Sequence, residues 1–324
     1  MFSRNLCGLF LFSLSFSFFS APSSFAAPSG AAVLKIDPSA RSFALGKSNA
    51  ITSQGAAALS ANPANTLNID QRYEVFSAFS SLMQDATYGH VAGVLNRSVT
   101  NNNWIDAMGF ALTRMSVSGL EGRDSSGSKT ADFKSQDTVM SFSFAGGVTD
   151  KLNVGLTGKM ITAEIAGYKA SASLAGDLGM SYKFKGFGRD LALGAALNNL
   201  GSGMRFISQK DPLPTAFNVG LAAAVGPFNL VGGISRLMNE GTTDASLGME
   251  YNIGVASLRA GYSGGSTVSS SGGDGASALM NGLTTGVGFK FSSMRLDYAL
   301  GQSNADLGLS HRVALTLEFG RKAQ

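Results

Sequence analysis

The chain has 324 residues, of which 44% are apolar and 14% are charged, and its formal net charge is +4. It contains 41 glycines and 7 prolines, a glycine content well above the usual ~7%. This composition excludes a helical bundle, because glycine weakens helices, and it excludes a collagen-like or wholly disordered chain. The charges are too evenly balanced to indicate nucleic-acid binding. We therefore expect a protein rich in β-strand.

Residues 1–26 are typical of a cleavable export signal. Arg4 supplies the initial positive charge, residues 6–19 form an apolar stretch, and residues 24–26 have the small-x-small pattern of a cleavage site. Cys7, the only cysteine, lies within this segment, so we expect no disulfide and no thiol metal site in the mature chain. No later stretch approaches the ~18 apolar residues of a transmembrane helix. If the chain spans a membrane, it does so with strands.

Residues 27–70 differ in character from the rest of the chain. They are rich in Ala, Ser and Asn and show no sustained alternation of apolar and polar residues. Asp37-Pro38 and residues 55–59 each indicate a short turn or helix, and Asn62-Pro63-Ala64 ends the second one. We treat residues 27–70 as a unit distinct from residues 71–324.

Residues 71–324 alternate with a period of two between turn signals, which predicts β-strands. Fourteen segments have this pattern: 72–83, 85–95, 104–117, 135–149, 151–165, 170–184, 189–200, 213–225, 227–239, 242–253, 255–264, 282–291, 293–302 and 307–319. Short links at 150–151, 185–188, 226–227, 253–254 and 292–293 alternate with longer polar ones at 118–134, 201–212 and 265–281. The first hairpin, whose link is short, and the 96–103 link do not fit this alternation.

Long strands, an even strand number and alternating link lengths are typical of a transmembrane antiparallel β-barrel. In the hydrocarbon of a membrane every backbone N–H and C=O must be hydrogen-bonded. A closed barrel is therefore the only arrangement of β-strands that can span it. Aromatic residues near segment ends are candidates for an interfacial belt: Tyr73, Tyr88, Trp104, Tyr182, Tyr251, Tyr262 and Phe319. The alternative is a secreted β-sandwich whose aromatics fill a core.

Two runs carry a resemblance to a known family. Residues 34–46 (LKIDPSARSFALG) and 58–64 (ALSANPA) resemble the amino-terminal signature of PorV/PorQ-type outer-membrane proteins, a branch of the FadL-like barrels. Residues 196–201 (ALNNLG) and 213–215 (LPT) resemble mid-barrel features of that family. The chain departs from the pattern at Ser53-Gln54-Gly55, where the family has paired acids, and at Asn65-Thr66, where it has glycine.

The resemblance implies about fourteen strands, location in a bacterial outer membrane, and a short amino-terminal segment that plugs the lumen. The plug motif is then Arg41, Gly46, Asn62, Pro63 and Ala64. The function implied first is a channel or binding protein for small hydrophobic molecules. The alternative is a PorV-like docking role in protein secretion, with secretion-system subunits or cargo contacting the external loops. Candidate loop residues for that role are Glu121, Arg123, Asp124, Lys129 and Asp274.

Signals for an enzyme, a cofactor or a metal are weak. Residues 261–265 match the G-x-S-x-G pattern of hydrolases, but they lead into a Gly/Ser-rich run without the helix that a nucleophile elbow requires. His90 and His311 are too far apart in sequence to indicate a shared metal. We therefore predict no enzymatic activity and no cofactor, and the outer-membrane lipid as the surroundings of the barrel.

Overall fold

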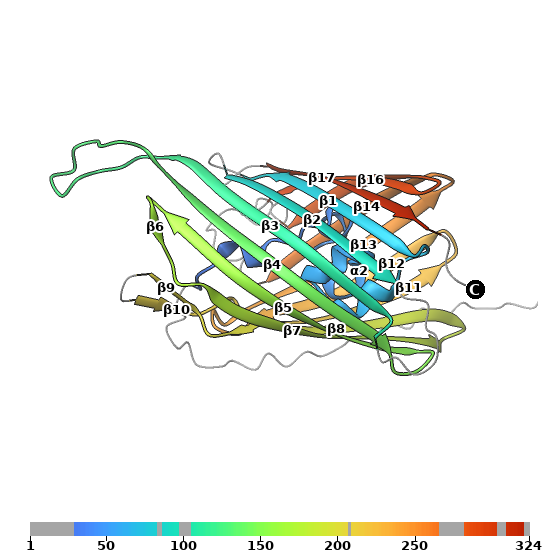
Figure 1. The fold of residues 1–324 in the computed structure, drawn as a ribbon. Coiled ribbons are helices and arrows are strands. Elements are labelled where there is room, and N and C mark those ends of the chain that lie inside the picture. The colour runs from blue at the N-terminus through green and yellow to red at the C-terminus, as the bar shows by residue number, and fades with distance from the viewer. Residues whose placement is uncertain are drawn as a thin grey trace, which may run out of the picture.

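The chain folds into a closed antiparallel β-barrel with short helices inside it (Figure 1). The computed structural model describes residues 29–82, 86–96, 105–206, 209–265, 282–302 and 309–320. Neighbouring strands pair in chain order, and the pairing of β4 with β5 and of β1 with β17 closes the ring. Because a closed ring pairs the backbone of every strand on both sides, no long sheet edge is exposed in the described wall.

The wall has fourteen long strands in the described chain, as the period-two pattern predicts. They are β1 (Tyr73–Ser81), β2 (Ala86–Asn96), β3 (Ala107–Leu120), β4 (Phe133–Gly147), β5 (Leu152–Ile165), β7 (Ser173–Gly186), β8 (Arg189–Gly201), β11 (Ala216–Val225), β12 (Phe228–Leu237), β13 (Thr242–Ile253), β14 (Ala256–Gly265), β15 (Leu283–Phe291), β16 (Met294–Gln302) and β17 (Leu309–Phe319).

Three further short strands lie in the links between the long strands of the wall. β6 (Tyr168–Lys169) extends the ladder of β5, and β9 (Met204–Phe206) pairs with β10 (Gln209–Asp211). The sequence pattern predicts only a polar loop at 201–212, so the β9–β10 hairpin corrects that expectation. Segments of two or three residues are too short to show a period, which is why the pattern does not reveal them.

Side chains alternate between lipid-type and lumen-type along each strand. In β1, Val75 and Phe79 are exposed on the outer face, whereas Glu74 and Ser80 are buried inside. Ionic side chains such as Lys159 in β5 are likewise buried in the lumen. Apolar residues outside and polar residues inside are the arrangement of a membrane barrel and the reverse of a water-soluble sandwich. The closed ring thus rules out the β-sandwich alternative.

The two ends of the barrel differ, and we call them the turn end and the loop end. Links 187–188, 226–227, 254–255 and 292–293 are tight turns at the turn end, where β17 also finishes. The β3–β4 hairpin projects far beyond the barrel at the loop end (Figure 1). The predicted long link at 265–281 lies almost wholly outside the described residues. The tightest turns therefore lie at one end, as the sequence predicts, although the loop-end link 238–241 is as short as the turn-end link 148–151.

Aromatic pairs stack on the outer face at the turn end. Tyr73 lies 5.7 Å from Phe319 between ring centroids, and Tyr251 lies 4.8 Å from Phe228. Tyr182, another candidate for the belt, is also exposed there. The belt prediction is wrong for Tyr88, which is 1% exposed and faces the lumen. The residue Trp104 lies outside the described residues.

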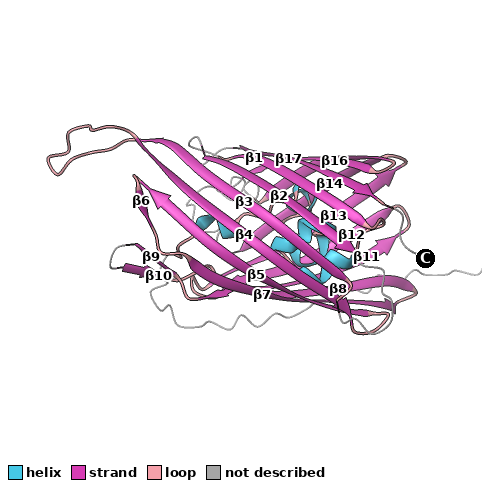
Figure 2. Ribbon diagram, viewed as in Figure 1, coloured by secondary structure: helices cyan, strands magenta, loops and turns pink. Residues whose placement is uncertain are grey.

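The amino-terminal segment lies inside the lumen (Figure 2). Its short helices are η1 (Ala32–Lys35), α1 (Ala40–Ala44), α2 (Asn49–Thr52), η2 (Gly55–Ser60) and η3 (Pro63–Leu67). None of the helices in the described ranges is long and apolar enough to cross a membrane. We call the amino-terminal segment 27–70, which the structure describes from residue 29 onward, the plug.

Candidate functional site

The plug contacts the whole circumference of the barrel. Helix α1 packs on β14 to β17, α2 on β8, β11 and β12, η2 on β1 to β4, and η3 on β3, β4, β5 and β7. Leu45 completes the ring by packing on Gly248 of β13. The plug begins at the loop end, where the Gly30 N–H donates to the Pro212 carbonyl at 2.9 Å, and it reaches β1 at the turn end. It therefore forms a disc across the lumen.

Inward-facing glycines let the plug backbone lie directly on the wall. A Cβ atom at Gly248 would come 2.6 Å from the Leu45 carbonyl oxygen, and one at Gly155 would come 2.5 Å from the Pro63 carbonyl carbon. Gly194 and Gly261 would clash in the same way with Ala50 and Gly46. Real Cβ atoms do not approach so closely, so any side chain at these sites would push the plug inward. This is one structural reason for the high glycine content.

Asn62, Pro63 and Ala64 of the predicted plug motif lie against the wall on the η3 side of the disc. The Asn62 side chain donates to the carbonyls of Ala50 (2.8 Å) and Met180 (3.0 Å) and accepts from the Ala64 N–H (3.2 Å), which caps η3. Pro63 occupies the first turn of η3, where its missing N–H costs nothing. Ala64 is fully buried. The motif therefore ties η3 to α2 and to β7.

Arg41 connects α1 to the barrel wall through an ion pair. Its guanidinium binds both carboxylate oxygens of Glu250 at 2.8 Å and donates to the Thr52 carbonyl at 2.9 Å. Glu250 also pairs with Arg259 at 2.6 Å, and Arg259 pairs with Asp297 at 2.6 Å. Bidentate Arg–carboxylate contacts are strong and geometrically specific. Arg41 thus fastens both α1 and the end of α2 to a buried ionic network on β13, β14 and β16.

Gly46 lies in the turn between α1 and α2. Its φ is +74°, in the left-handed region that favours glycine, and its N–H donates to Thr284 Oγ1 at 3.2 Å. Lys47 follows with φ +65° and extends its ammonium toward the Phe43 ring, 5.6 Å from the centroid. The plug motif is therefore distributed over the disc: Arg41 and Gly46 hold its α1 side, and residues 62–64 hold its η3 side.

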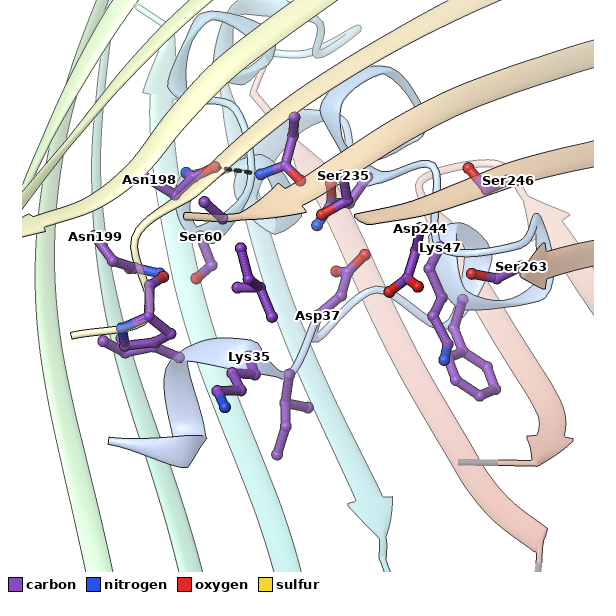
Figure 3. Close-up of a pocket in the computed structure, with 18 of the residues that line it drawn as sticks. Lys35, Asp37, Lys47, Ser60, Asn198, Asn199, Ser235, Asp244, Ser246 and Ser263 are labelled. Atoms are coloured by element: carbon purple, nitrogen blue, oxygen red, sulfur yellow. Dashed lines mark hydrogen bonds between the residues drawn. The ribbon is translucent and has the colours of Figure 1, made fainter. Parts of the chain in front are cut away.

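Two cavities lie on opposite sides of the plug. The loop-side cavity has a volume of about 450 Å³ and is lined by Asn49 of α2 (Figure 3). The turn-side cavity has a volume of about 850 Å³ and is lined by Ile51 and Thr52 of the same helix. Both volumes fall in the range of small-molecule sites. A single turn of helix, α2, therefore separates the two cavities at this point.

The candidate loop residues lie at the tip of the β3–β4 hairpin, away from the plug. Glu121 pairs with Arg123, and Lys129 pairs with Glu121 at 3.4 Å. Asp124 accepts hydrogen bonds from the N–H groups of Ser126 and Ser128, each at 2.9 Å. The predicted loop residue Asp274 lies outside the described residues. The charged side chains of this tip therefore satisfy one another.

The weak chemical motifs do not form sites in the described chain. Residues 261–265 lie inside β14 (Ala256–Gly265) and not at a strand-to-helix turn. His90 is buried beside Thr113, and His311 pairs with Tyr298 on the outer face. No group of three or more metal-ligating side chains occurs among the described residues.

Comparison with known proteins gives relatives in structure only. No protein-family model and no curated protein matches the sequence. The barrel is similar to the toluene transporter TodX of Pseudomonas putida, with a TM-score of 0.60 and 16% identity over 86% of this chain and 98% of that one. It is also similar to a FadL homologue of Pseudomonas aeruginosa, with a TM-score of 0.50 and 11% identity over 86% and 98% of the two chains. The fold is that of the FadL-type outer-membrane barrels.

A deletion variant described as the TodX monoaromatic hydrocarbon channel has the same FadL-type fold, with a TM-score of 0.55 and 16% identity over 86% of this chain and 98% of that one. The FadL-like part of the sequence resemblance is therefore confirmed at the level of fold. Its finer PorV/PorQ-type assignment stays a prediction. The five residues of the predicted plug motif all lie in the lumen segment, and their role stays a prediction. Sequence reasoning misses the ionic network around Glu250, because strand residues far apart in sequence form it.

Proposed function

We propose that this protein is a bacterial outer-membrane channel that passes small molecules with a hydrophobic body. In this proposal residues 1–26 are a signal peptide, residues 27–70 are the plug and residues 71–324 are the barrel, with the turn end in the periplasm. The observation that carries it is the pair of cavities on the two faces of α2. A solute held in the loop-side cavity reaches the turn-side cavity once α2 moves. The names of the structurally similar transporters agree with this role.

An irregular seam in the wall beside the loop-side cavity suggests how an apolar solute enters. The β8–β11 ladder stops at the pair Asn198 and Ala216. Beyond it, Asn199 has φ +60°, and its side chain, not the backbone, donates to the Pro214 carbonyl at 3.0 Å. All four of these residues line the cavity. Where side-chain contacts replace the backbone hydrogen bonds between two strands, less free energy is needed to separate the strands. We therefore place the lateral entrance between β8 and β11.

A reversible lock on α2 tests the proposal. The hydroxyls of Ser48, which precedes α2, and Ser246, on β13, are 2.7 Å apart. This proximity suits a disulfide, and Cys7 is the only native cysteine. In cells expressing S48C/S246C, we expect oxidation to reduce toluene uptake to the level without the protein and dithiothreitol to restore it. The single variants S48C and S246C control for the loss of each hydroxyl. Equal uptake by the locked and reduced forms would contradict passage past α2.

A docking role in secretion would depend on the projecting β3–β4 hairpin. Its Glu121, Arg123 and Lys129 side chains pair within the hairpin, which leaves no charge of one sign for a partner. The channel is therefore the function that the described geometry favours.

A further inference from the structure

One side of the loop-side cavity is a continuous polar belt. Asn218 of β11 is the cross-strand neighbour of Ser235 of β12, and Ser235 is the neighbour of Asp244 of β13. Ser246 of β13 is in turn the neighbour of Ser263 of β14. All five residues line the cavity, and the three serines and Asp244 are seen around it in Figure 3. We call these five residues the polar belt.

The opposite side of the same cavity is apolar. Leu34 and Ile36 of the plug, Leu82 at the end of β1 and Met115 of β3 line it. The cavity is therefore two-sided, and a ligand that fills it contacts amide and hydroxyl groups on one side and hydrocarbon on the other. A plain hydrocarbon makes favourable contacts only with the apolar side.

Several belt groups have no hydrogen-bond partner in the part of the chain that the structure describes. The hydroxyls of Ser235 and Ser263 form no side-chain hydrogen bond there, and the Asn218 amide oxygen accepts none, although its nitrogen donates to Asn198 at 2.8 Å. Water satisfies such groups in an empty cavity. A hydrocarbon that displaces this water leaves them unpaired, which is costly, whereas a solute oxygen replaces the lost bonds.

The charges around the cavity balance one another. Lys35 pairs with Glu240. The Arg312 guanidinium lies 3.9 Å from the Phe43 ring centroid and donates to the Asp37 carbonyl. The remaining cation, Lys47, lies beside Asp244, and the Asp37 carboxylate also faces the cavity (Figure 3). Three cations and three carboxylates give no net attraction for an anion or a cation.

We propose that the loop-side cavity selects uncharged solutes that combine an apolar body with a hydroxyl or carbonyl oxygen, such as alcohols, phenols and ketones. The proposal rests on the channel function and specifies its substrate class. The oxygen binds the polar belt through Ser235, Ser263 and Asn218, and the body packs on the apolar side. Sites that bind a hydroxyl disfavour the analogue that lacks it, because their polar groups are then left unpaired.

Ligand-observed ¹⁹F NMR on the full barrel in nanodiscs tests this selectivity. The probes are 4-fluorobenzyl alcohol, 4-fluorotoluene and 4-fluorobenzoate, which share one aromatic body, and empty nanodiscs give the lipid background. We expect the alcohol to bind about three- to tenfold more tightly than either analogue, the gain of a single net hydrogen bond. In S235A/S263A we expect that preference to disappear. S181A, which removes a lumen hydroxyl on the turn side of the plug, serves as the matched control and keeps the preference.

The possible failures are distinguishable. Equal binding of the alcohol and the fluorotoluene, tighter binding of the benzoate, or an unchanged preference in S235A/S263A would overturn the selectivity and leave the channel standing. If no probe binds above the empty nanodiscs, both the selectivity and the use of this cavity as a solute site are wrong.

Discussion

Three of the asparagines of the plug, Asn62, Asn65 and Asn68, lie in or beside η3 and provide a graded test of what holds the plug in place. The Asn62 side chain makes three hydrogen bonds to backbone groups: it donates to the Ala50 and Met180 carbonyls and accepts from the Ala64 N–H. Asn65 makes one, to the Ala50 carbonyl at 3.0 Å. The Asn68 side chain makes no hydrogen bond to the backbone; its oxygen accepts from the Lys183 ammonium at 3.1 Å and its nitrogen donates to Asn65 Oδ1 at 3.5 Å.

The free energy of these hydrogen bonds determines how much the fraction of displaced plug should rise when each side chain is removed. A net contribution of about 1 kcal/mol for each bond gives about 2–3 kcal/mol for Asn62 and about 1 kcal/mol for Asn65. Since 1.36 kcal/mol is a factor of ten, the displaced population should rise roughly 30- to 150-fold in Asn62→Ala and roughly fivefold in Asn65→Ala. For Asn68→Ala we expect no change.

The assay is the open probability of single barrels in a planar lipid bilayer, where a displaced plug leaves an ion-conducting lumen. The predicted order of open probability is Asn62→Ala, then Asn65→Ala, then Asn68→Ala together with the unmodified chain. Equal open probabilities in all three variants would refute the assignment of Asn62 as the principal anchor of the plug.

Other contacts give three further predictions. Gly194→Ala should expose the plug to protease, because a Cβ there meets the Ala50 carbonyl, whereas Gly158→Ala, with open space around its Cβ, should match the unmodified chain; equal digestion would argue against close packing. Ser29→Cys should react with a membrane-impermeant maleimide added outside the cell, since Ser29 bonds Glu240 at the loop end, and labelling only from the periplasmic side would reverse the proposed orientation. Partial burial of Glu240 opposes its ionisation, but bonds from Lys35 and Ser29 outweigh it and hold its pKa below the usual 4.5. A depressed carboxyl pKa stabilises the contact above pH 4.5 and loses that effect as the pH falls through the lowered value, so the hydrogen-exchange protection factors of residues 29–36, corrected for the intrinsic pH dependence of exchange, should stay constant above pH 4.5 and fall below it; protection that is lost at higher pH instead would contradict this.

The strands could be predicted because barrel walls repeat one simple rule. Each of the fourteen alternating segments became a strand whose ends lie within three residues of the prediction. Alternation is visible in a single sequence because every outward residue meets the same surroundings, lipid. The tight turns were visible for a related reason, since positions such as Gly226 and Gly254 adopt positive φ.

The interior could not be predicted in the same way. That Gly194 accommodates the Ala50 carbonyl, or that Arg41 reaches Glu250 209 positions away, depends on how the ring closes. Tyr88 shows the same limit, because its place near a strand end suggested the lipid interface although its register turns it inward. The polar belt is likewise formed by one or two residues from each of four strands, none of which is unusual within its own strand.

The proposed channel depends on residues 34–64 closing an otherwise continuous barrel. The most direct measurement is the ion conductance of single barrels with and without these residues, using heat-modifiable mobility in SDS gels to show that both forms are folded. We predict that the full chain is mostly closed and that the folded deletion variant conducts steadily. A folded deletion variant that remains as closed as the full chain would contradict the account.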